Sequence, residues 1–178
     1  MKKIFLGAAM TLAAANANAG LLLDFYAGAT YGGGKSIAFV PTSKDLKNNA
    51  DAYGAVFGID IPIIRVEAEY NRLVAKDIAL NAGMLNAYLK MPVPVITPYV
   101  GFGAGRVFGG DLPNNESASA SSAFQGMLGV QLDIPATPLF VDVEGRVFYA
   151  DSIDTIPVIN KDVGFLQYDA RIKLRYVF

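Results

Sequence analysis

A strict alternation of apolar and polar side chains at the end of the chain constrains the fold more than any other feature. The apolar set comprises Leu166, Tyr168, Ala170, Ile172, Leu174, Tyr176 and Phe178, and the polar set comprises Gln167, Asp169, Arg171, Lys173 and Arg175. Side chains of a β-strand point alternately to opposite faces, so this period of two predicts a strand with one apolar and one charged face.

Seven further segments carry β patterns of similar length. We predict strands over residues 21–33, 51–61, 63–73, 80–90, 96–108, 122–134, 139–149 and 163–178. Each is near the length of about 9–11 residues that a tilted membrane-spanning strand requires. The most apolar region, residues 92–105, is interrupted by Pro94, Pro98, Gly101 and Gly103, which argues against a transmembrane helix there.

The predicted connections alternate in character along the chain. Those after the second, fourth and sixth strands are short and contain proline, at residues 62, 91–95 and 135–138. Those after the first, third, fifth and seventh strands, at residues 34–50, 74–79, 109–121 and 150–162, are mostly longer and polar. Short turns at one end and longer loops at the other are typical of membrane barrels of the bacterial outer membrane.

Alternation by itself leaves two architectures open. In a membrane barrel the apolar face points outward to lipid, whereas in a soluble β-sandwich or a lipocalin-like barrel it points inward. For the membrane barrel, we expect the charged faces to fill the interior, because eight strands leave room for little more than side chains. The predicted lumen residues are Arg65, Glu67, Glu69, Lys90, Asp133, Asp142, Glu144, Arg146, Asp169, Arg171, Lys173 and Arg175.

Buried charges need partners, so we expect these side chains to form an ionic network along the lumen. The main role of such a network would be to stabilise the barrel. Its secondary role would be to provide a narrow or gated path for ions. The carboxylate pairs Glu67/Glu69 and Asp142/Glu144 are therefore interpreted as ion-pair partners of nearby arginines in preference to acid–base catalysts.

The first residues predict export. Lys2 and Lys3 precede an apolar run over residues 4–15, and Ala17-Asn18-Ala19 forms a small-residue cleavage motif. This order is typical of a secretory signal peptide, and the run is shorter than the roughly 20 residues of a spanning helix. We predict a signal peptide over residues 1–19 and a single mature domain over residues 20–178 that begins at Gly20.

Composition removes several classes of function. The 178 residues include neither histidine nor cysteine, so the commonest catalytic base and thiolate chemistry are absent. We predict no enzyme activity, no cofactor and no metal site. The formal net charge of −1, with no basic cluster beyond the first residues, predicts no nucleic-acid partner.

The ending Tyr176-Val177-Phe178 decides between the two architectures at this stage. It resembles the C-terminal assembly signal of outer-membrane barrels, in which Tyr176 and Phe178 would be read by the insertion machinery. With its glycine- and aromatic-rich segments at residues 24–32 and 98–105, the mature chain is similar to the outer-membrane β-barrel domain family that includes the OmpA transmembrane domain and the opacity-type surface proteins.

That resemblance implies an all-β, eight-stranded, antiparallel, up-and-down barrel in the Gram-negative outer membrane. Its partners would be outer-membrane lipid and lipopolysaccharide, the insertion machinery during assembly, and an extracellular ligand bound through the loops. The expected function is structural and surface-presenting, with adhesion or recognition through the loops. The alternative is a porin-like protein of small conductance for ions or small solutes.

Overall fold

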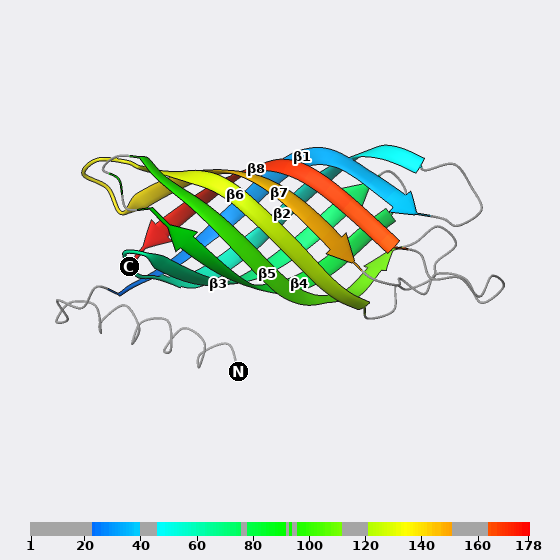
Figure 1. The fold of residues 1–178 in the computed structure, drawn as a ribbon, viewed down its shortest axis with the longest axis horizontal. Helices are drawn as coiled ribbons and strands as arrows, with labels where there is room; N and C mark the ends of the chain where they lie inside the picture. The colour runs from blue at the N-terminus through cyan, green and yellow to red at the C-terminus, as the bar shows by residue number, and fades with distance from the viewer. Residues whose placement is uncertain are drawn as a thin grey trace.

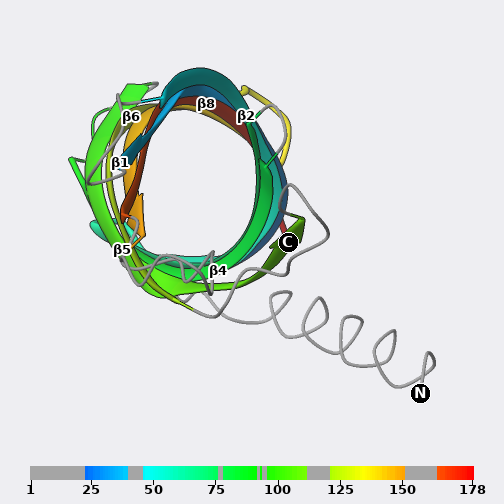
Figure 2. The ribbon, with the colours of Figure 1, turned by 90° about the vertical axis from the view of Figure 1, so that its right-hand side faces the viewer.

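Eight antiparallel strands close into a barrel. The computed structural model describes residues 23–39, 46–75, 78–91, 93, 96–111, 121–150 and 164–178. Its strands are β1 (Asp24–Phe39), β2 (Leu46–Asp60), β3 (Ile64–Ala75), β4 (Ile78–Lys90), β5 (Ile96–Asp111), β6 (Ser121–Asp133), β7 (Leu139–Ala150) and β8 (Gly164–Val177). Each strand pairs with the next, and β1 also pairs with β8 (Figures 1 and 2). The predicted fold class is confirmed.

The segment expected to be the signal peptide, residues 1–19, lies outside the described residues, as does Gly20. Among the residues that the structure does describe, no helix is long and apolar enough to cross a membrane.

The first hairpin extends further than predicted. Residues 34–50 were expected to form a loop, but β1 continues to Phe39 and β2 begins at Leu46. At Gly34, where the predicted loop begins, a Cβ would lie 2.6 Å from the Cα of Asp169 on β8. Glycine at this position therefore allows β1 and β8 to approach closely, and β1 continues to Phe39.

Two other connections at the same end are also shorter than predicted, whereas the connection between β7 and β8 keeps its predicted length. Strand β3 ends at Ala75 and β4 begins at Ile78, while β5 ends at Asp111 and β6 begins at Ser121. The predicted loops at residues 74–79 and 109–121 therefore include strand residues at their edges.

We call the end that carries the connections at residues 61–63, 91–95 and 134–138 the turn end, and the opposite end the loop end. At the turn end, Ile61 N donates to Ile64 O at 2.9 Å, and Ile134 N donates to Leu139 O at 3.2 Å. Pro98 lies within β5 and has no N–H to donate. Pairing between β4 and β5 ends at Lys90 and Tyr99, so no β4 residue of the ladder needs that N–H. The Pro98 carbonyl still accepts a hydrogen bond from Met91 N at 2.9 Å, so the ladder loses little.

The two faces of the barrel differ sharply in polarity. On β8, Lys173 is 0% exposed and Ile172 is 58% exposed, and this alternation recurs on β3, β6 and β7. The charged faces therefore point into the barrel and the apolar faces point outward. A soluble barrel would have the reverse arrangement, so that alternative is wrong.

Candidate functional site: a charge-filled lumen

The interior of the barrel gathers the predicted charged residues. Eleven of the twelve predicted lumen residues are buried. The exception is Asp133, which is exposed in the last position of β6 and accepts a hydrogen bond from Gln131 Nε2 at 2.9 Å. Its expected burial in the lumen is corrected: Asp133 shares the inward side of β6 with Gln131, but the strand ends there, so its carboxylate is exposed at the turn end.

A first ionic layer lies nearest the turn end and centres on Asp142. This carboxylate accepts hydrogen bonds from Arg65 Nη1 at 3.0 Å and from Arg175 Nε and Nη2, both at 2.9 Å. Arg175 also pairs with Asp60 at 3.2 Å, and Asp60 in turn pairs with Lys90. Each charged group here has an opposite charge within reach, as burial requires.

Aromatic rings hold the first layer in place. The Arg65 guanidinium lies 4.1 Å from the ring centroid of Tyr88 and 4.6 Å from that of Tyr99, and the two rings meet edge to face at 5.4 Å. The Arg175 guanidinium lies 4.7 Å from the ring of Tyr26. Cation–π contacts of this kind are strengthened when water is excluded.

A second ionic layer is organised around Glu67. Its carboxylate accepts hydrogen bonds from Tyr26 Oη at 2.7 Å, Tyr88 Oη at 2.9 Å and Lys173 Nζ at 2.8 Å. Lys173 Nζ also lies 3.8 Å from Glu144, which accepts a hydrogen bond from Tyr99 Oη at 3.1 Å. One lysine thus serves two carboxylates, and further hydrogen bonds come from tyrosine hydroxyls and from Asn86 Nδ2, which donates to Glu67 at 3.3 Å.

A third ionic layer lies towards the loop end. Arg171 pairs with Glu69 at 2.9 Å and with Asp169 at 2.7 Å, and Arg146 pairs with Asp169 at 2.9 Å. Gln125 Nε2 donates to Glu69 at 2.9 Å and its Oε1 accepts from Arg146 at 3.0 Å. This layer is therefore a closed cycle of charged and amide groups contributed by β3, β6, β7 and β8.

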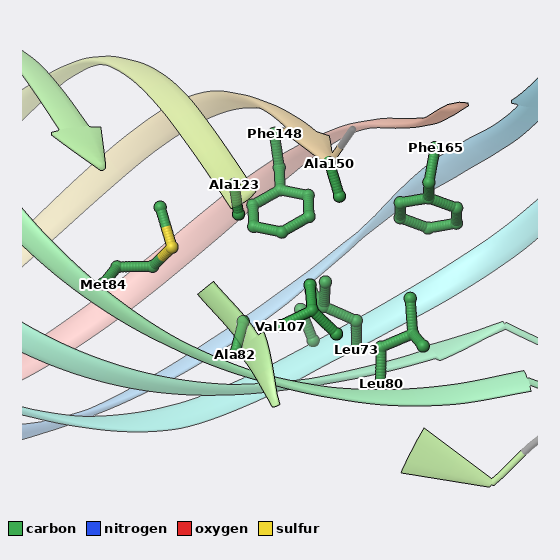
Figure 3. Close-up of a cluster of buried hydrophobic side chains, with 10 residues drawn as sticks. Leu73, Leu80, Ala82, Met84, Val107, Ala123, Phe148, Ala150 and Phe165 are labelled. Atoms are coloured by element: carbon green, nitrogen blue, oxygen red, sulfur yellow. The ribbon is translucent and has the colours of Figure 1, made fainter. Parts of the chain in front are cut away.

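Beyond the third layer the interior becomes apolar. The described cluster contains Ala52, Leu73, Leu80, Ala82, Met84, Val107, Ala123, Phe148, Ala150 and Phe165. In Figure 3, Phe148 and Phe165 extend from one wall towards Leu73, Leu80 and Val107 on the other. The rings of Phe148 and Phe165 meet at 6.4 Å. We call this group the apolar layer. It lies in the lumen towards the loop end, beside buried Ser36, Ser121 and Gln167, and none of the described charged side chains is buried there.

The buried charges of the described lumen balance. The cations are Arg65, Lys90, Arg146, Arg171, Lys173 and Arg175, and the anions are Asp60, Glu67, Glu69, Asp142, Glu144 and Asp169. Six charges of each sign give no net charge. Since every one of them has at least one opposite partner within 4.0 Å, the interior is an ion-pair network without a surplus.

Several functional side chains escaped the sequence prediction. Tyr26, Tyr88 and Tyr99 point inward although tyrosine is also expected in the outward aromatic girdle. Asp60 was missed because the other inward positions of its strand, such as Ala52 and Val56, are small or apolar and give no polar pattern. Its inward position could be inferred only by aligning β2 with a neighbouring strand whose inward face is marked by charged residues.

The predicted assembly residues lie at the turn end. Phe178 N donates to Phe25 O of β1 at 2.9 Å, which joins the last residue to the first strand. The rings of Tyr176 and Phe178 meet edge to face at 5.3 Å, and both are about half exposed. Their role in assembly stays a prediction.

No protein-family model and no curated protein sequence matches this chain. Among solved structures, it is similar to Neisserial surface protein A, NspA, with a TM-score of 0.64 and 18% identity over 84% of this chain and 95% of that one. It is also similar to the N-terminal β-barrel domain of Pseudomonas aeruginosa OprF, with a TM-score of 0.55, 13% identity, and coverage of 85% and 99%. A third likeness is to outer membrane protein AlkL, with a TM-score of 0.50, 15% identity, and coverage of 87% and 90%. The predicted likeness in fold to outer-membrane barrels is confirmed.

Proposed function

We propose that this chain, which has the fold of the eight-stranded outer-membrane β-barrels, is an integral outer-membrane protein with a closed lumen and a structural, surface-presenting role. The observation that carries the proposal is the arrangement of its two faces. Charges are paired inside, while large apolar side chains such as Leu128, 71% exposed, face outward. An apolar outer band on a closed sheet is stable in lipid and unfavourable in water.

The orientation follows from the connections. Outer-membrane barrels have short periplasmic turns and longer extracellular loops. The turn end, with its connections at residues 61–63 and 134–138, is therefore assigned to the periplasm, and the loop end to the cell exterior. Adhesion or recognition would be carried by the connections between β1 and β2, between β5 and β6, and between β7 and β8.

The filled interior argues against a wide aqueous channel. Three ionic layers and one apolar layer are stacked along the lumen, and the rings of Phe148 and Phe165 lie in the apolar layer. Among the described residues, an ion that entered from the loop end would pass the apolar layer, with Ser36, Ser121 and Gln167 beside it, before it reached a buried charge. A dry constriction of this kind opposes conduction.

One observation favours the second candidate, a small-conductance pore. Several buried polar atoms among the described residues have no hydrogen-bond partner, including Arg65 Nε and Nη2, Arg146 Nε and Arg171 Nη2. Unsatisfied donors of this kind are the sites at which buried water is held. A chain of such waters would be the start of a conducting path.

Planar-bilayer recording separates the two candidates. The folded protein, inserted into a bilayer, is expected to leave the membrane current at its baseline over several hundred millivolts. Reproducible single-channel steps that scale with salt concentration would favour the pore. The protein should first be shown to be folded in detergent. A recording without current steps then reports on the folded barrel.

Labelling of intact cells tests the orientation. The chain has no cysteine, so each introduced cysteine is unique. Thr137→Cys, in the exposed turn between β6 and β7, should resist a membrane-impermeant maleimide until the outer membrane is opened. Ser117→Cys, in the connection between β5 and β6, should react in intact cells. The reverse pattern would overturn the orientation.

Assembly and partners complete the proposal. We assign the Tyr176 and Phe178 pattern to recognition by the outer-membrane insertion machinery, because the two rings meet edge to face and are about half exposed next to the junction of β8 with β1. The lasting partners are the lipids around the barrel. No catalytic step is proposed, since the buried carboxylates are all engaged in ion pairs and the chain lacks histidine.

A further inference from the structure

The outward face of β2 to β5 contains a hollow of about 620 Å³. Its floor is made of small residues, namely Ala55, Ala68, Gly83 and Ala104, and its walls are made of Phe57, Tyr70, Leu85, Arg106 and Phe108. These residues all lie on the outward side of the barrel, which the proposed function places against lipid.

The strand register explains why the surface is hollowed there. Gly83 on β4 stands opposite Tyr70 on β3 and opposite Arg106 on β5. The central position of this row of three therefore has no side chain. Phe108, at a register shift between β4 and β5, places a ring carbon 3.2 Å from the position of a Cβ on Gly83. The bulge redirects the side chain of Phe108, which forms the wall of the hollow on the loop-end side.

Polar groups rim the loop-end side of the hollow. Tyr70 Oη donates to Asn81 Oδ1 at 2.9 Å, and Arg72 Nη1 approaches the same oxygen at 3.4 Å. The ring of Tyr70 lies 6.1 Å from that of Phe108. Arg72 on β3 and Arg106 on β5 flank β4, and each neighbouring strand lies about 5 Å away. Arg106 stands opposite Gly83, and Arg72 stands opposite Asn81, two residues nearer the loop end. Both side chains are long enough to reach the surface above Gly83.

An arginine on the lipid-facing surface needs a partner. Arg106 is exposed between Ala104 and Phe108 on the outward face of β5. A cation there is unfavourable in hydrocarbon and becomes acceptable at the headgroup level, where it meets an anion. Its guanidinium matches the geometry of a phosphate, which it can bind through two parallel hydrogen bonds.

We propose that this hollow is a specific site for one phosphate-bearing glycolipid of the outer leaflet. An acyl chain lies over Gly83 and Ala104, and a headgroup phosphate binds Arg106, with Arg72 as the second cation. This inference rests on the proposed membrane location and on the assignment of the loop end to the cell exterior. The lipid that is bound here is distinguished from bulk lipid by its charge and by the shape of the hollow.

The chemistry favours this occupant over others. In a bilayer, an acyl chain gains no hydrophobic free energy by moving from lipid to protein, so selectivity must come from close packing and from the headgroup. A second copy of the chain is disfavoured, because a two-fold interface would place Arg106 of each copy against the same cationic patch of the other. A neutral lipid would offer no anion to the exposed guanidinium of Arg106.

The test is lipid binding by full-length protein refolded into bilayer nanodiscs. Lipid A with both phosphates, and lipid A with its phosphates removed, are the probes, and native mass spectrometry counts bound molecules. The wild type should retain one phosphorylated molecule. Arg106→Gln should weaken that binding about fivefold, as expected for the loss of one basic residue at an anionic lipid surface, while Arg106→Lys should retain most of it.

A matched glycine pair tests the hollow itself. Gly83→Leu fills the floor of the hollow and should lower retention, whereas Gly126→Leu adds the same side chain to β6 at an outward position with nothing within 4 Å. Equal retention by both variants, or equal binding of the dephosphorylated probe, would overturn the inference. So would a dimer that Gly83→Leu dissociates without a change in lipid retention. Failure of the wild type to insert into any bilayer would instead contradict the proposed function.

Discussion

Replacement of Asp142 by asparagine should destabilise the barrel more than any conservative change on its outer surface. Asp142 is 0% exposed and receives three charge-assisted hydrogen bonds, one from Arg65 and two from Arg175. Arg175 keeps Asp60 and Gln131 as partners in the variant, but Arg65 loses Asp142, its one ion-pair partner among the described residues. A buried cation left without an anion costs about 3–5 kcal/mol.

The magnitude can be apportioned with a second substitution. Arg65→Met alone should cost less than Asp142→Asn, because Asp142 keeps both hydrogen bonds from Arg175. The double variant Arg65→Met/Asp142→Asn removes one charge of each sign. Its destabilisation should therefore fall short of the sum of the two single changes, by about 1–3 kcal/mol for groups in direct contact.

Urea unfolding of the protein in lipid vesicles measures these differences. The chain has no tryptophan, so the transition is best followed by far-ultraviolet circular dichroism or by the gel mobility of folded barrel. Asp133→Asn is the matched control, since Asp133 is exposed, and it should stay within about 0.5 kcal/mol of the wild type. A similarly small effect for Asp142→Asn would refute the reasoning, because it would mean that water, and not Asp142, solvates Arg65.

Three further predictions can be tested. Gly58→Ala should cost about 1–3 kcal/mol in the same assay, because its Cβ would lie 2.5 Å from both Tyr26 Oη and Val66 O, whereas Gly126→Ala should be near neutral. The intact mass of protein extracted from outer membranes should correspond to a chain that begins at Gly20, and a mass that includes residues 1–19 would contradict the signal peptide. Deletion of Phe178 should strand the chain in the periplasm while the purified variant still refolds in detergent; normal membrane levels with failed refolding would assign the residue to stability.

The fold was largely predictable because lipid imposes a simple rule on both faces of a barrel. On β8, charges at every second position from Asp169 to Arg175 leave one consistent assignment of faces. The boundaries were less predictable where glycine has two meanings. At Gly34, where the predicted loop begins, the missing side chain lets β1 pass close to β8, so the strand continues beyond the predicted boundary.

The interior was predictable in its charges and not in its other groups. Charged side chains are unfavourable on the lipid face away from the headgroups, so parity locates Glu67 and Arg171 from sequence alone. A tyrosine such as Tyr88 is acceptable on either face, and an apolar residue such as Phe148 would ordinarily be assigned to lipid. The apolar layer therefore became visible only when the strands were placed around a common axis.

The central claim is that the apolar face of this barrel is immersed in lipid. Single cysteines at Ala170, Ile172 and Leu174 of β8, each carrying a spin label, test it most directly in reconstituted bilayers. Their relaxation should be dominated by oxygen, which concentrates in the hydrocarbon, while a label at Thr137 in the turn should respond to a water-soluble relaxant. Accessibility of all three β8 positions to the water-soluble relaxant would contradict the account.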